Sequence, residues 1–160
     1  YAGVLEAQRT GIEAYARWYD GIFDLSPVAL ADVWGDSTPE LLFVASDPDL
    51  PWSQSVLTIV TCQNGQAVTI LQEDWDFFAG SGLRYTVFLA EDGTLWADTN
   101  YYTSRLVEEP WAFAESAGGL TMGAAESLPD PAQVILSNQK EAEAAMTVDE
   151  AEALLRNGGL

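Results

Sequence analysis

Hydrophobic and polar positions change their spacing along this chain, from a helical period at the start to alternation in the middle. Over residues 1–20, apolar side chains recur every three or four residues, which predicts an amphipathic helix. The apolar positions are Val4, Leu5, Ile12, Tyr15 and Tyr19. We therefore expect the chain to begin with a helix that packs one face on a core.

Between residues 28 and 123 the pattern is that of short β-strands separated by turns. Segments rich in β-branched and apolar residues predict strands at 28–33, 41–45, 56–62, 67–72, 84–89, 94–98, 104–107 with an extension toward 113, and 120–123. Turn sequences such as Gln63-Asn64-Gly65 join several of them directly. Short connections between successive strands predict an antiparallel meander.

The composition changes again after Ser127. Two prolines interrupt residues 127–133, and residues 140–157 are rich in alanine and glutamate, which predicts a C-terminal helical segment. Thr147 and Glu150 have the spacing of a capping box. The predicted fold class is α+β: an antiparallel β-meander of five to seven strands with an N-terminal and a C-terminal helix, in a single domain over residues 1–160.

The charge is one-sided: six Lys and Arg against 25 Asp and Glu, a net charge of −19. Such a chain repels nucleic acid and anionic lipid. No apolar run has the length of a membrane span. We expect no nucleic-acid partner and no direct membrane insertion. The chain begins at Tyr1 without an apolar leader, so we expect that a signal or lipoprotein segment has been removed.

Missing residue types exclude several reaction classes. The sequence has no histidine and one cysteine, which excludes Ser-His-Asp and Cys-His sites, the usual zinc ligand sets and an intrachain disulfide. Cys62 ends an apolar run and is expected to be a small core or strand-end residue. A carboxylate-dependent glycoside hydrolase is the enzymatic alternative, because that reaction needs two acids. In a chain with 25 acidic residues, two neighbouring acids are common and do not by themselves indicate a catalytic pair. We therefore expect no catalysis.

Two segments combine aromatic and acidic residues, as carbohydrate-binding surfaces do. Trp52 lies in the first, and Trp75, Asp76 and Phe77 lie in the second; Tyr101 would join them if the segments converge. We take these residues as the candidate binding site, for a glycan or a cell-envelope protein. The alternative is that the aromatic rings complete the core at the ends of the sheet.

Residues 30–44 read as strand, acidic turn, strand. Asp32, Asp36, the Thr38 carbonyl and Glu40 have the outline of a calcium loop, because calcium prefers six to eight oxygen ligands. Position 3 of that loop is a tryptophan. The alternative is a polar turn closed by hydrogen bonds from its aspartates, and we expect the loop to be vestigial and empty, with calcium bound weakly if at all and no other cofactor.

This turn resembles the Asp-x-Asp-Gly-Asp-Gly-Thr-Pro-Glu-Leu segment of uncharacterised secreted and lipoprotein domains of gut Gram-positive bacteria. More distantly it is similar to the acidic loops of FG-GAP and VCBS-type repeats. The resemblance continues in residues 64–68 and 80–95, while Trp34 and Ser37 depart from the pattern. It implies an extracellular or cell-surface domain without a known activity. Our interpretation is a non-catalytic domain that serves recognition or envelope structure, and the alternative is a glycoside hydrolase or carbohydrate-binding module.

The degenerate loop predicts a weak response to calcium. Three carboxylates and one carbonyl would bind with a dissociation constant on the order of 0.1–1 mM or weaker. At about 1 mM calcium the stabilisation would be at most about 1.4 kcal/mol. We expect a barely shifted melting temperature. A large calcium-dependent rise that Asp36→Ala abolishes would show a working metal site.

Overall fold

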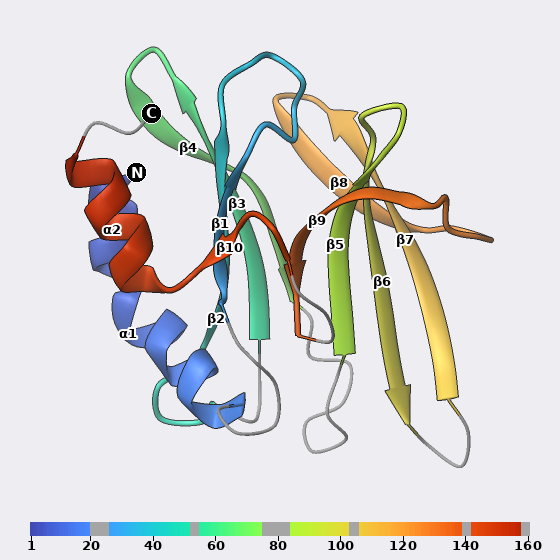
Figure 1. Cartoon of the computed structure of the whole chain (residues 1–160), viewed down its shortest axis with the longest axis horizontal. Coiled ribbons are helices and arrows are strands. Elements are labelled where there is room, and N and C mark those ends of the chain that lie inside the picture. Colours follow the sequence, from blue (N-terminus) through green and yellow to red (C-terminus); the bar gives the residue numbers. More distant parts are fainter. Residues whose placement is uncertain (20–25, 52–54, 75–83, 103–105, 139–141, 158–160) are drawn as a thin grey trace.

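The computed structural model describes residues 1–19, 26–51, 55–74, 84–102, 106–138 and 142–157. Within them, a helix near each end flanks ten β-strands (Figure 1). In chain order they are α1 (Ala2–Tyr19), β1 (Val28–Ala31), β2 (Glu40–Ser46), β3 (Ser55–Gln63), β4 (Gln66–Asp74), β5 (Arg84–Ala90), β6 (Leu95–Tyr102), β7 (Leu106–Ser116), β8 (Gly119–Ala124), β9 (Pro131–Ser137), β10 (Ala145–Met146) and α2 (Val148–Arg156).

The strands form two antiparallel sheets. The first, sheet A, has the order β10-β1-β2-β3-β4, and the second, sheet B, has the order β8-β7-β6-β5-β9. The predicted α+β class with antiparallel strands and terminal helices is confirmed. The described residues contain ten strands rather than five to seven, and the meander is divided between two sheets, each completed by one strand from the C-terminal part of the chain.

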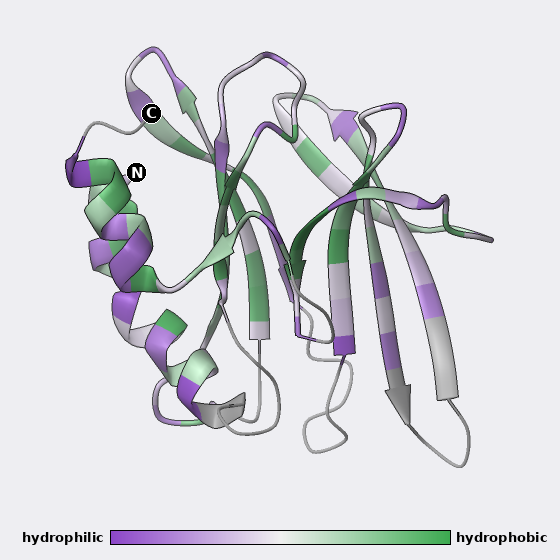
Figure 2. Ribbon diagram, in the orientation of Figure 1, coloured by the Kyte–Doolittle hydropathy of each residue, from purple (hydrophilic) through white to green (hydrophobic). Residues whose placement is uncertain are grey.

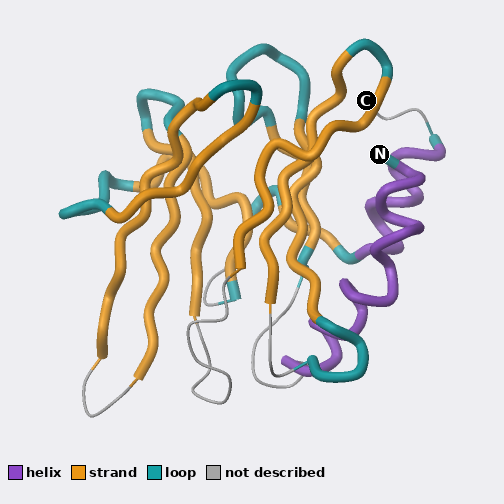
Figure 3. Tube along the Cα trace, turned by 180° about the vertical axis from the view of Figure 1, so that it is seen from behind, coloured by secondary structure: helices purple, strands orange, loops and turns teal. Residues whose placement is uncertain are grey.

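The molecule has three layers: the two helices, then sheet A, then sheet B (Figures 1 and 3). One apolar core lies between the two sheets, and a second lies between sheet A and the helices. Hydropathy alternates along several strands (Figure 2), as expected where successive side chains point to opposite faces. Within the described residues, no helix is long and apolar enough to cross a membrane.

Strand β2 is buried on both faces. Leu42 and Val44 belong to the core between the sheets, whereas Leu41 and Phe43 belong to the core under the helices. This explains the continuous apolar run at 41–44, since a strand covered on both sides has no solvent face to alternate with. Each such side chain contributes about 1.5–3 kcal/mol on burial.

The C-terminal part differs from the expected helical segment over 140–157. Ala145–Met146 is strand β10, which pairs with β1, and the helix begins at Val148. Pairing with the free edge of β1 overrides the helix propensity of this alanine-rich stretch. The predicted capping box is present: Thr147 Oγ1 accepts from the Glu150 amide, and the Glu150 carboxylate accepts from the Thr147 amide.

Strand β9 was also missed by the sequence pattern, which read residues 127–133 as a breaker. Pro131 is the first residue of β9 at the edge of sheet B. A proline is tolerated there because an edge strand needs no inward donor at its first residue. The apolar residues that follow, Ile135 and Leu136, are fully buried.

Polar contacts join α1 to α2 and to sheet B. The Arg9 guanidinium donates to Glu13 on its own helix and to Asp149 and Glu152 on α2. Tyr15 belongs to the core between the sheets, and its hydroxyl lies 3.2 Å from that of Tyr85 on β5. Helix α1 is therefore tied to α2 and to sheet B as well as to β2.

The two sheets approach each other closely where β4 meets β8. A Cβ atom built at Gly119 would lie 2.7 Å from the carbonyl oxygen of Ile70, whereas one at Gly123 on the same strand meets nothing within 4 Å. Glycine is required at the first position because any side chain would force two backbones apart.

This pair of glycines predicts opposite responses to alanine. Gly119→Ala should destabilise the protein by about 1–3 kcal/mol, the usual range for overpacking. Gly123→Ala, the matched control, should be neutral or stabilising by about 0.4–1 kcal/mol through the unfolded state. Denaturant unfolding measures both, and equal midpoints for the two variants would contradict the close approach of β4 and β8.

Candidate functional site

Hydrogen bonds from its own backbone close the acidic turn. Asp32 accepts from the Gly35 amide at 2.7 Å with one carboxylate oxygen and from the Ser37 amide at 2.9 Å with the other. Asp36 accepts from the Thr38 amide at 2.8 Å. Aspartates commonly close tight turns in this way.

Glu40 is fully buried at the base of the turn, where its carboxylate binds backbone amides of the turn. One carboxylate oxygen accepts from the amides of Val33 at 2.9 Å and Trp34 at 3.1 Å, and the other accepts from the Thr61 hydroxyl at 2.9 Å. Burial raises the pKa of Glu40 above its ordinary value, while these three hydrogen bonds act in the opposite direction. Its carboxyl group therefore anchors the loop to β3.

At least five of the six carboxylate oxygens of Asp32, Asp36 and Glu40 accept hydrogen bonds from the protein. Within the described residues, no three or more acidic or cysteine side chains are grouped so that they could hold a metal ion. Trp34 is partly buried and packs against the core between the sheets. The turn is thus held by packing and hydrogen bonds.

The hairpin of β3 and β4 extends beyond the core at this end of the molecule. Residues 62–67 are all exposed, and Cys62 is among them. The expectation of a core cysteine was therefore wrong, although its place near the end of a strand was right. The apolar run predicted burial, but the neighbouring strands do not reach far enough to cover its last residue.

The predicted aromatic site lies largely outside the described residues. Trp52, Trp75, Asp76 and Phe77 belong to undescribed segments, and of Tyr101 only the backbone in β6, paired with Val107, is described. The described ends of β4, β5 and β6 that lead into these segments lie at the same end of the molecule as the loop 47–51 (Figure 1). The acidic turn lies at the opposite end.

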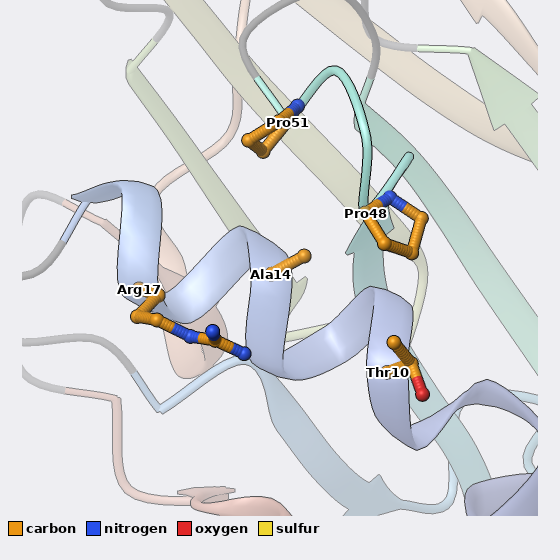
Figure 4. Close-up of a pocket in the computed structure, with 5 residues that line it drawn as sticks. All are labelled: Thr10, Ala14, Arg17, Pro48 and Pro51. Atoms are coloured by element: carbon orange, nitrogen blue, oxygen red, sulfur yellow. The ribbon is translucent and has the colours of Figure 1, made fainter.

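A groove runs between α1 and the loop 47–51, and we call it the α1 groove. It has an apolar compartment of about 350 Å³ and an adjoining compartment of about 290 Å³, which share Thr10 and Pro48. Figure 4 shows the first, with Thr10, Ala14 and Arg17 on the helix and Pro48 and Pro51 on the facing loop. The second is lined by polar side chains of β3 and β4, including Thr58 and Gln72.

The helical side of the groove follows from residue spacing. Thr10, Ala14 and Arg17 lie four and three residues apart, so they share one face of α1. The second compartment exists because the helices pack over β1 and β2 and leave the outer face of β4 to polar residues. Gln72 pairs with Thr58 in the sheet, and both face this open side.

The loop side of the groove is a constrained turn. The Leu50 amide donates to the Asp47 carbonyl at 3.2 Å, and the Asp49 amide donates to the Asp47 carboxylate at 2.9 Å. Aspartate and proline at the first two positions favour this turn, because Pro48 fixes its own backbone angle. Leu50 is the one large hydrophobic side chain that is exposed among the described residues, at 46%.

Arg17 differs from the other arginines whose ion pairs the structure describes. Arg9 and Arg156 form ion pairs with carboxylates, whereas no carboxylate of the described residues pairs with Arg17, which is exposed. Figure 4 shows its side chain running back along α1 in the direction of Thr10. A groove wall in a chain of net charge −19 thus carries a positive charge that no carboxylate of the described part of the chain neutralises.

The sequence pattern did not single out these groove residues. The pattern predicts an amphipathic helix over residues 1–20 and an aromatic and acidic segment around Trp52, but it does not indicate that the helix lies beside residues 47–51. The available signal was an apolar residue between two prolines in the loop. Comparison with known proteins adds no assignment: no family model, curated protein or solved structure matches the chain.

Glu40 predicts a distinctive pH dependence. Its pKa in the native protein is raised above the ordinary 4.5, so its contribution to stability is complete below that value and is lost as the pH rises through the raised pKa. Glu40→Gln cannot ionise. We expect the free energy of unfolding of the wild type to fall relative to that of Glu40→Gln as the pH rises through this window.

Urea unfolding at a series of pH values measures this difference. The control is Glu115→Gln, at an exposed position, which removes the same charge without burial. An identical pH dependence of the two variants relative to the wild type would contradict the role of Glu40.

Proposed function

We propose that this chain is a non-catalytic recognition domain of an extracellular or cell-surface protein, and that it binds a partner protein in the α1 groove. The observation that carries the proposal is the convergence of three features on one groove. These are the constrained proline wall, the exposed Leu50 in the loop that carries this wall, and Arg17, which pairs with no carboxylate of the described residues. Binding sites typically combine an apolar surface with a few placed polar groups.

The groove is suited to binding rather than to turnover. Asp47 is the only carboxylic acid among the described residues that line it, and its carboxylate already accepts from the Asp49 amide. Glycoside hydrolysis needs two acids that flank the bond. The hydroxyl groups of Thr10 and Thr58 have no histidine to activate them, since the sequence contains none.

The rigidity of the loop favours recognition. A wall that is already ordered loses little conformational entropy when a ligand binds. The net charge of −19 repels nucleic acid and anionic lipid, so a protein is a more suitable partner than either. The resemblance of the acidic turn to secreted and lipoprotein domains supports the extracytoplasmic location.

Filling the groove should abolish binding. Thr10 is exposed and lines both compartments, so Thr10→Trp should block the groove without disturbing the core. Thr121→Trp, at an exposed position on sheet B, is the matched control. We expect wild type and Thr121→Trp to bind members of a peptide array, and Thr10→Trp to bind them at least about tenfold more weakly.

A glycan array tests the alternative with the same three proteins. Glycan binding without peptide binding would replace the proposal with a carbohydrate-binding module. Peptide binding that Thr10→Trp leaves unchanged would show that recognition takes place outside the α1 groove. Either outcome contradicts the function proposed here.

A further inference from the structure

We propose that the α1 groove binds the C-terminal end of a partner's polypeptide chain, with the terminal carboxylate on Arg17 and the last side chain, an apolar one, against the proline wall. This inference rests on the proposed function and narrows it to one kind of ligand.

The guanidinium of Arg17, which has no carboxylate partner among the described residues, favours a ligand that carries an anionic group. An arginine presents a planar fork of donors that matches a carboxylate with two parallel hydrogen bonds. The protein has 25 acidic residues, yet those in the described residues leave Arg17 without a carboxylate partner. Thr10 lies on the same helical wall of the groove (Figure 4).

The size of the apolar compartment argues for a chain end. Arg17 lines the same space of about 350 Å³ as Ala14, Pro48 and Pro51. A ligand that fills this compartment therefore needs an anionic group and an apolar group within a few bonds of each other. The last residue of a polypeptide has both, because its carboxylate and its side chain are attached to one Cα atom.

The second compartment accommodates the residues before the chain end. It adjoins the first at Thr10 and Pro48, and its walls include the amides of Gln8 and Gln72 and the hydroxyl of Thr58. Amide and hydroxyl groups both donate and accept hydrogen bonds, as peptide groups require. An apolar compartment with a cation, followed by a polar one, matches an extended chain that ends in an apolar residue.

Arg17 also stands in the last turn of α1, where any cation interacts favourably with the helix dipole. That role needs only a positive charge, which lysine supplies equally well. Recognition of a carboxylate by two parallel hydrogen bonds needs arginine. Arg17→Lys and Arg17→Gln therefore separate the two roles.

The test uses an array of short peptides that end in Leu, Val, Phe or Ala, each made with a free C-terminal carboxylate and with a C-terminal amide. A third set carries internal Asp or Glu and an amidated end. We expect the wild type to bind free-acid peptides at least about tenfold more tightly than their amides. Arg17→Gln should lose this preference and Arg17→Lys should lose most of it, whereas Arg156→Gln, the control on α2, should keep it.

The outcomes separate this inference from the proposed function. Peptide binding that Thr10→Trp abolishes but that does not distinguish acid from amide overturns the chain-end inference and leaves the groove as the binding site. Equal binding of amidated peptides with internal acids also overturns it, in favour of acidic side chains. If Thr10→Trp affects no peptide, both the inference and the proposed function fail.

Discussion

Burial of β2 on both faces is the constraint on which the rest of this structure depends. Leu42 and Val44 require a cover on one side, and Leu41 and Phe43 require one on the other. Sheet B supplies the first and the helices supply the second. Both layers pack on β2 because it presents apolar side chains on both faces. The three-layer order therefore follows from this one strand.

The same arrangement creates the α1 groove. The two helices pack over β1 and β2 but leave the outer face of β4 uncovered, and polar residues such as Gln72 lie there. Gly11 lets α1 approach β2 closely, since a Cβ atom there would lie 3.0 Å from the Ser46 carbonyl. The loop that follows Ser46 is thereby held beside the helix, and its prolines become the opposite wall.

The two ends of the molecule differ in how their charged side chains are paired. At one end the carboxylates of Asp32, Asp36 and Glu40 accept hydrogen bonds from backbone amides of their own turn. At the other end Arg17 has no such partner among the described residues. Polar groups that already satisfy each other stabilise a loop, whereas an unpaired charge in a groove remains available to a ligand.

The sequence by itself determined the local elements: the amphipathic period of α1, the strands with their hairpin turns, the capping box at Thr147 and the polar character of the acidic turn. These features depend on neighbours within a few residues, so the local pattern of hydrophobic and polar residues predicts them. Tertiary structure alone decided that Ala145–Met146 is a strand, that Cys62 is exposed and that Arg17 lines the same groove as Pro48 and Pro51. Each of these depends on contacts or cover from segments distant in the chain, and no spacing of residues encodes which distant segment packs against which.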